Sequence, residues 1–92
     1  STPNIRVNSS TSLNSLMAIG QSIVVNIITT AAAGGYSAQL TIDGANVTEN
    51  WIGGAAPAAG GASGLDIYAF TIIKTANATF TVIGNLSNTA AS

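Results

Sequence analysis

The chain has very little charge: five of its 92 residues, or 5%, against roughly 25% in a typical soluble domain. Charge keeps isolated proteins dispersed in water. We therefore expect this chain to pack against copies of itself or against another protein. The net charge is −1, and no basic cluster is present to neutralise phosphates, which argues against nucleic-acid binding. The charged residues are Arg6, Asp43, Glu49, Asp66 and Lys74.

Cysteine and histidine are both absent. The core therefore has no disulfide or thiolate metal site to supplement it, and the commonest general base is missing. Serine and threonine are plentiful, but Lys74 is the only base for activating one, and Ser63 lies outside any nucleophile-elbow motif. The three carboxylates lack calcium-loop spacing, so we interpret them as solvated turn and strand residues. The sequence predicts no enzyme, no metal and no cofactor.

Long apolar runs are missing too. The longest, residues 23–28, is interrupted by Asn26 and is far shorter than the ~20 residues that span a bilayer. We therefore expect no membrane insertion. The N-terminal residues lack the charged and apolar regions of a signal peptide. We expect Ser1 to follow a removed initiator methionine or a processed leader, and both alternatives stay open.

What the chain does have is β-branched residues in alternating patterns, which predict strands. We expect a hairpin turn at Asp43-Gly44, because glycine tolerates the positive φ of a tight turn, and another turn at Ala76-Asn77. The predicted strands cover residues 20–30, 36–43, 46–52, 65–75 and 78–83, with a polar segment from Gly84 onward. Residues 20–30 and 65–75 are apolar on both faces, so loops or a neighbouring subunit must cover the second face. The low charge favours the neighbouring subunit.

This pattern predicts one all-β domain over residues 16–88, an immunoglobulin-like β-sandwich of six or seven strands. A small β-barrel is the alternative. Residues 1–15 are expected to form an extended polar arm, and residues 13–19 a strand or one helical turn. Residues 53–64 contain only glycine, alanine, serine and Pro57, which predicts a flexible loop, and residues 89–92 form a tail.

Partner contacts are expected in two places. In the arm they are Ile5, Arg6 and Val7, where Arg6 would pair with a carboxylate of the partner. Beside the flexible loop they are Trp51 and Pro57, because an aromatic next to a mobile loop is a reasonable contact residue. The chain also carries four glycosylation sequons, which would add solubility in a secreted protein; they begin at Asn8, Asn46, Asn77 and Asn85.

A compact all-β chain with an arm, no cysteine and almost no charge resembles the small immunoglobulin-like decoration (cement) proteins of tailed-phage capsids. The resemblance covers the whole chain in style and includes no diagnostic motif. It implies a non-enzymatic subunit on the virion surface, often a trimer of copies of itself, that binds a major capsid protein across subunit boundaries.

Two alternatives stay open. An extracellular, pilus-like adhesive subunit would assemble by strand exchange, with the arm completing a neighbour's sheet. The second alternative is a protease inhibitor, since residues 29–36 and the glycine-rich residues 60–64 are similar to two loops of the chagasin-like inhibitors of papain-type proteases. The chain lacks the Asn-Pro and Arg-Pro-Trp elements of that family.

Overall fold

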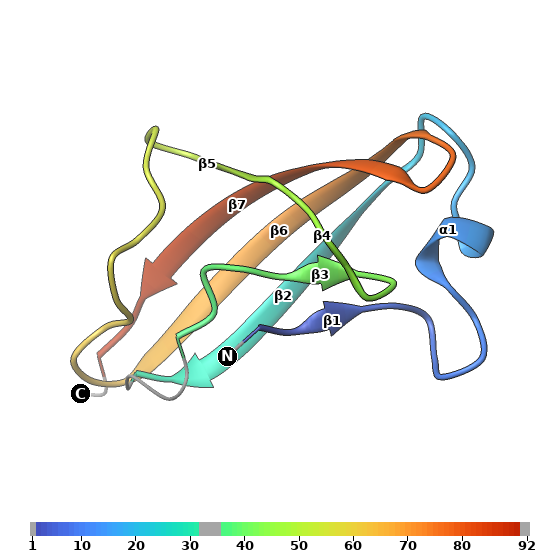
Figure 1. Ribbon diagram of the computed structural model, residues 1–92. Helices are drawn as coiled ribbons and strands as arrows, with labels where there is room; N and C mark the ends of the chain where they lie inside the picture. Colours follow the sequence, from blue (N-terminus) through green and yellow to red (C-terminus); the bar gives the residue numbers. More distant parts are fainter. Residues whose placement is uncertain (1, 32–35, 91–92) are drawn as a thin grey trace.

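The computed structural model describes residues 2–31 and 36–90, which form seven strands and one helical turn (Figure 1). The all-β prediction is confirmed. The barrel alternative is wrong, because the strands form two separate sheets of three and four strands. The elements are β1 (Asn4–Ile5), α1 (Leu13–Leu16), β2 (Ser22–Thr30), β3 (Thr41–Ile42), β4 (Ala45–Asn46), β5 (Glu49–Trp51), β6 (Leu65–Ala76) and β7 (Thr79–Asn88).

The four-stranded sheet has the order β2-β6-β7-β5 and contains all the long strands. β2, β6 and β7 are antiparallel, whereas β5 runs parallel to β7. The β6–β7 turn lies at Asn77-Ala78, one residue later than predicted. The strand predicted over residues 78–83 is longer in the structure: β7 continues to Asn88, and the mostly polar residues 84–88, expected to be part of a tail, pair with β6.

The three-stranded sheet has the order β1-β3-β4 and is built from two-residue strands. The predicted hairpin turn is confirmed, with positive φ at Asp43 (52°) and Gly44 (81°). The two long strands predicted on either side of this turn are not formed. The hairpin pairs only residues 41–42 with 45–46, and β5 joins the other sheet. Packing explains the difference, because Trp51 makes an edge contact with Phe70 at 5.6 Å between ring centroids.

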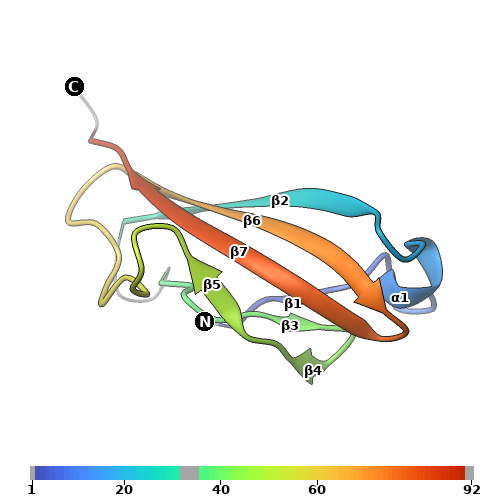
Figure 2. The ribbon, with the colours of Figure 1, turned by 90° about the horizontal axis from the view of Figure 1, so that it is seen from above.

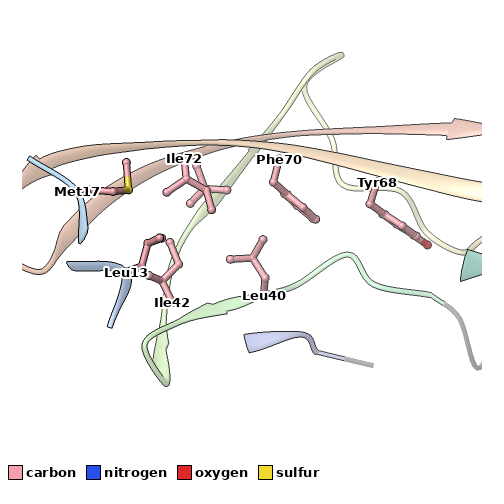
Figure 3. Close-up of a cluster of buried hydrophobic side chains, with 8 residues drawn as sticks. Leu13, Met17, Leu40, Ile42, Tyr68, Phe70 and Ile72 are labelled. Atoms are coloured by element: carbon pink, nitrogen blue, oxygen red, sulfur yellow. The ribbon is translucent and has the colours of Figure 1, made fainter. Parts of the chain in front are cut away.

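The core lies between the two sheets (Figure 2). The four-stranded sheet contributes Tyr68, Phe70, Ile72 and Val82, all with no exposed surface. Figure 3 shows Leu40 and Ile42 opposite Tyr68, Phe70 and Ile72, with Leu13 and Met17 at one end of the core. The period of two in the sequence puts these buried residues on one face of each strand, and in β6 they alternate with the half-buried Ile67, Ala69, Thr71 and Ile73.

The N-terminal residues, expected to be an extended arm, pack on the domain. Asn4 and Ile5 pair in parallel with β3, and the Asn4 side-chain oxygen accepts hydrogen bonds from the Thr41 hydroxyl and the Gly44 amide, both at 2.8 Å. Of the two structures expected for residues 13–19, the helical turn is the one formed, and its Leu13 is buried.

Candidate functional site

Four of the five charged side chains are turned toward the protein's own backbone. Asp66 is fully buried and accepts the Gly61 amide at 2.9 and 3.1 Å. The half-buried Glu49 accepts the Leu40 amide at 3.2 Å. Our interpretation of the carboxylates as solvated turn and strand residues is therefore wrong for Asp66, and Glu49 and Asp43 are only partly exposed.

The helical turn α1 takes up two more charges, one at each end. The Asp43 carboxylate accepts the Leu13 and Asn14 amides at 2.6 and 2.9 Å, which suits the N-terminus of a helix. The buried Lys74 ammonium donates to the carbonyls of Asn14 and Met17 at 2.7 and 2.9 Å. These two charges stabilise α1, a helix too short to form from its intrinsic helix propensity alone.

Arg6 is the one exposed charged residue, since the chain's other four are half-buried or buried. The surface is therefore poorer in charge than the composition suggests. A monomer with such a surface has little to prevent association.

The outer face of the four-stranded sheet, the side away from the core, is an uncharged region of this surface. Its outward residues include no charged side chain. Val24, Ile28 and Leu65 on it are 64%, 61% and 45% exposed, respectively. The outer face comprises Ser22, Val24, Asn26, Ile28 and Thr30 of β2, Leu65, Ile67, Ala69, Thr71 and Ile73 of β6, and Thr81, Ile83, Asn85 and Ser87 of β7.

This face is continuous because the strands pair in unbroken register across it. Val24 lies beside Thr71 and Thr71 beside Ile83, while Asn26, Ala69 and Asn85 form the next row. Residues 20–30 and 65–75 were predicted to be apolar on both faces. In the structure, their outward residues form one shared surface. Among the described residues, no segment pairs or packs over it as the short strands and α1 do over the inner face.

The sheet also has a long open edge, because β2 is its terminal strand. At the two ends of β2, Gln21 accepts the Lys74 amide at 3.0 Å and Ala31 donates to the Gly64 carbonyl at 3.1 Å. Bonded residues alternate along an antiparallel ladder, so the odd-numbered residues of β2 point their amides and carbonyls toward β6. The even-numbered residues, 22 to 30, therefore present theirs to the open edge.

A cleft of about 840 Å³ lies beside β5 on the other side of the molecule. Tyr36, Glu49 and Trp51 line it together with residues 54–56 of the glycine-rich loop. Among the described residues that line the cleft, Glu49 is the one carboxylate, and it already accepts a backbone amide. The described residues include no group of three potential metal ligands, and no helix in them is long and apolar enough to cross a membrane.

The predicted contact residues fall at two separate places. Ile5, Arg6 and Val7 lie in and after β1, where Ile5 packs on the core while Arg6 and Val7 are exposed. Trp51 lines the cleft, and the Pro57 carbonyl accepts the Tyr36 hydroxyl. The structure does not bring the two groups together.

The loop of residues 53–64 is attached to the fold at several points. Besides Pro57, Gly54 donates to Trp51 at 3.0 Å, and Asp66 holds Gly61. Of the segment similar to inhibitor loops, residues 32–35 lie outside the described part of the chain. The four sequon asparagines are all exposed.

Sequence reasoning named no residue of the open edge as a contact. A signal was present, since residues 22–30 contain no charge, no proline and no glycine. What the pattern lacks is strand order, and only strand order makes β2 an edge. No family model, no curated protein and no solved structure matches the chain.

Proposed function

We propose that the protein is a non-enzymatic structural subunit that packs its outer face against neighbouring proteins in a multi-copy assembly. The observation that carries this proposal is the continuous, uncharged outer face with exposed Val24, Ile28 and Leu65. Burying apolar surface contributes roughly 25 cal/mol per Å², and a face without charges avoids the large cost of desolvating them. Such a face is well suited to contact and unsuited to permanent exposure.

The setting that we propose is the surface of a virion, where the protein acts as a decoration subunit bound to a major capsid protein across subunit boundaries. The near-absence of exposed charge supports a role at a protein surface. Many copies would each add a small free energy to the shell, and multivalency would make the sum large. The same proposal takes the two facing sheets as a variant of the immunoglobulin-like sandwich, with the parallel pairs β1–β3 and β5–β7 as its departures.

The predicted contact residues keep a secondary place in this proposal. Exposed Arg6 and Val7 lie beyond β1, and Trp51 and Pro57 lie by the cleft, so each group would meet a different neighbour. The pilus-like alternative has less support, because residues 4–5 already pair with β3 and would have to leave it to complete a neighbour's sheet.

The test uses density-gradient purification of particles from the biological source of the chain. We expect the protein in the particle fraction in many copies. Thr71→Lys places a charge at the centre of the outer face and should move the protein to the soluble fraction. Asn46→Lys adds the same charge at an exposed position of β4 in the other sheet and should leave it bound. Absence of the wild-type protein from particles, or retention of the Thr71→Lys variant, would overturn the proposal.

A further inference from the structure

The open edge of β2 is unusual for a sheet edge because nothing in its sequence discourages pairing. Natural edge strands are kept short or carry lysine, proline or a bulge. The other terminal strands here, β1, β4 and β5, have only two or three residues. β2 has nine, pairs with β6 without a register shift, and contains no charge, proline or glycine. Among residues 2–31 and 36–90, no strand pairs with this edge, which is about 30 Å long.

We propose that β2 pairs antiparallel with β2 of a second copy of the chain, about a two-fold axis at Asn26. This inference deepens the proposed function, on which it rests only in assuming that the chain works in an assembly. The pairing would join two four-stranded sheets into one. Figure 1 shows β2 along one margin of the sheet, with β6 on its other side.

The hydrogen-bonding pattern of the edge fits this axis. In an antiparallel pair centred on residue 26, the numbers of two facing residues add up to 52. Even-numbered residues therefore meet even-numbered residues, and these are the ones whose amides and carbonyls point outward. Every outward group from residue 22 to residue 30 then finds a partner, which gives about ten backbone hydrogen bonds.

The side chains fit the same axis, because the sequence of β2 is nearly palindromic in chemistry. On the outer face Val24 meets Ile28 of the second copy, and on the inner face Val25 meets Ile27. At the ends, Ser22 meets Thr30. β-branched residues pair well across strands, and hydroxyl residues opposite one another exchange hydrogen bonds. Shifting the centre by two residues in either direction loses this match.

Asn26 lies at the centre, where a residue must face its own copy. A side-chain amide carries both donors and acceptors, so two copies complement each other. A charged residue at this position would instead meet a like charge. Because the two outer faces lie on the same side of the joined sheet, the pairing also doubles the width of the uncharged surface.

An isologous pairing of this kind closes at two copies, so it predicts a dimer rather than the trimer that the resemblance implies. A single strand pair is smaller than the standard interface of about 1,600 Å², so we expect a dissociation constant of micromolar order. Sedimentation velocity on the purified full chain from about 1 μM to about 1 mM covers this range.

The decisive variant is Asn26→Lys, which places two ammonium groups face to face at the axis. We expect dimerisation to weaken about 100-fold or more. The matched control is Asn85→Lys, which adds the same charge to the same row of the outer face, two strands from the edge. It should dimerise like the wild type. An equimolar mixture of Asn26→Lys and Asn26→Asp should form a heterodimer, which shows that the lysine variant is folded.

The outcomes separate this inference from the proposed function. Dimerisation that Asn85→Lys weakens as strongly as Asn26→Lys would mean association through the outer face and would overturn the edge pairing. A monomer at every concentration would also overturn it. Loss of particle binding by Thr71→Lys tests the proposed function alone, because Thr71 lies on β6 and its backbone does not border the edge.

Discussion

Replacing the buried Lys74 with methionine, an apolar residue of similar length, should destabilise the fold. The ammonium donates to two carbonyls of residues 14 and 17, and the residue is only 8% exposed. Hydrogen bonds to charged groups contribute about 1.5–3 kcal/mol each. Methionine fills the same space and recovers part of the loss through apolar burial. We expect a net destabilisation of about 2–4 kcal/mol.

For a domain of this size, 1 kcal/mol corresponds to about 4–8 °C in melting temperature, so Lys74→Met should melt about 8–32 °C lower. The assay is urea unfolding followed by the fluorescence of the single tryptophan, with thermal melts by circular dichroism. Arg6→Met is the matched control, because it removes the same charge from an exposed position, and we expect a change within about 0.5 kcal/mol. If the two variants proved equally stable, the structural role assigned to the buried ammonium would be wrong.

Three further substitutions test other contacts. Gly84→Ala places a Cβ 3.0 Å from the Trp51 ring and should cost about 1–3 kcal/mol and shift the emission of Trp51; unchanged stability would contradict this packing. Gly61→Ala places a Cβ 2.7 Å from a carboxylate oxygen of Asp66, so elastase should cleave the loop of residues 53–64 several-fold faster than in the wild type. Asp43→Ala removes the acceptor of two amides of α1 and should cost about 2–4 kcal/mol in urea unfolding, whereas Asp43→Asn, which tolerates the positive φ, should cost less.

Local patterns predicted the parts of the fold that depend on neighbours in sequence. The period of two placed Tyr68, Phe70 and Ile72 on one face, and Asp-Gly at 43–44 predicted the hairpin turn. The path of residues 46–52 was not predictable in this way, because β5 is drawn to β7 by the packing of Trp51, a contact between distant segments.

The structural roles of the charged residues could not be predicted from the sequence for a related reason. The sequence shows Asp66 and Lys74 on the same face as the aromatic core residues, but their partners are backbone groups. The carbonyl of Asn14 is 60 residues away from Lys74 in the chain. The missing calcium-loop spacing therefore suggested solvated carboxylates, whereas in the folded chain Asp43 and Lys74 bind the backbone of α1 and Asp66 binds that of the loop 53–64.

The sequence predicted part of the outer face and its β2 edge. Apolar residues on both faces of residues 20–30 and 65–75 indicated a surface in need of cover. That these strands are neighbours, and that β2 is terminal, follows from strand order, which hairpin patterns alone do not set. Only when β2 is known to be an edge strand does its near-palindromic sequence about Asn26 indicate pairing with a second copy.

The most direct test of the account is amide hydrogen exchange along β2, measured by NMR at low and high protein concentration. The odd-numbered amides bond to β6 and should be protected throughout. The amides of Val24, Asn26 and Ile28 should exchange rapidly in the dilute protein and become protected as concentration rises, because a second copy then covers the edge. Rapid exchange of these three amides even at high concentration would contradict the account, and so would full protection in the dilute protein.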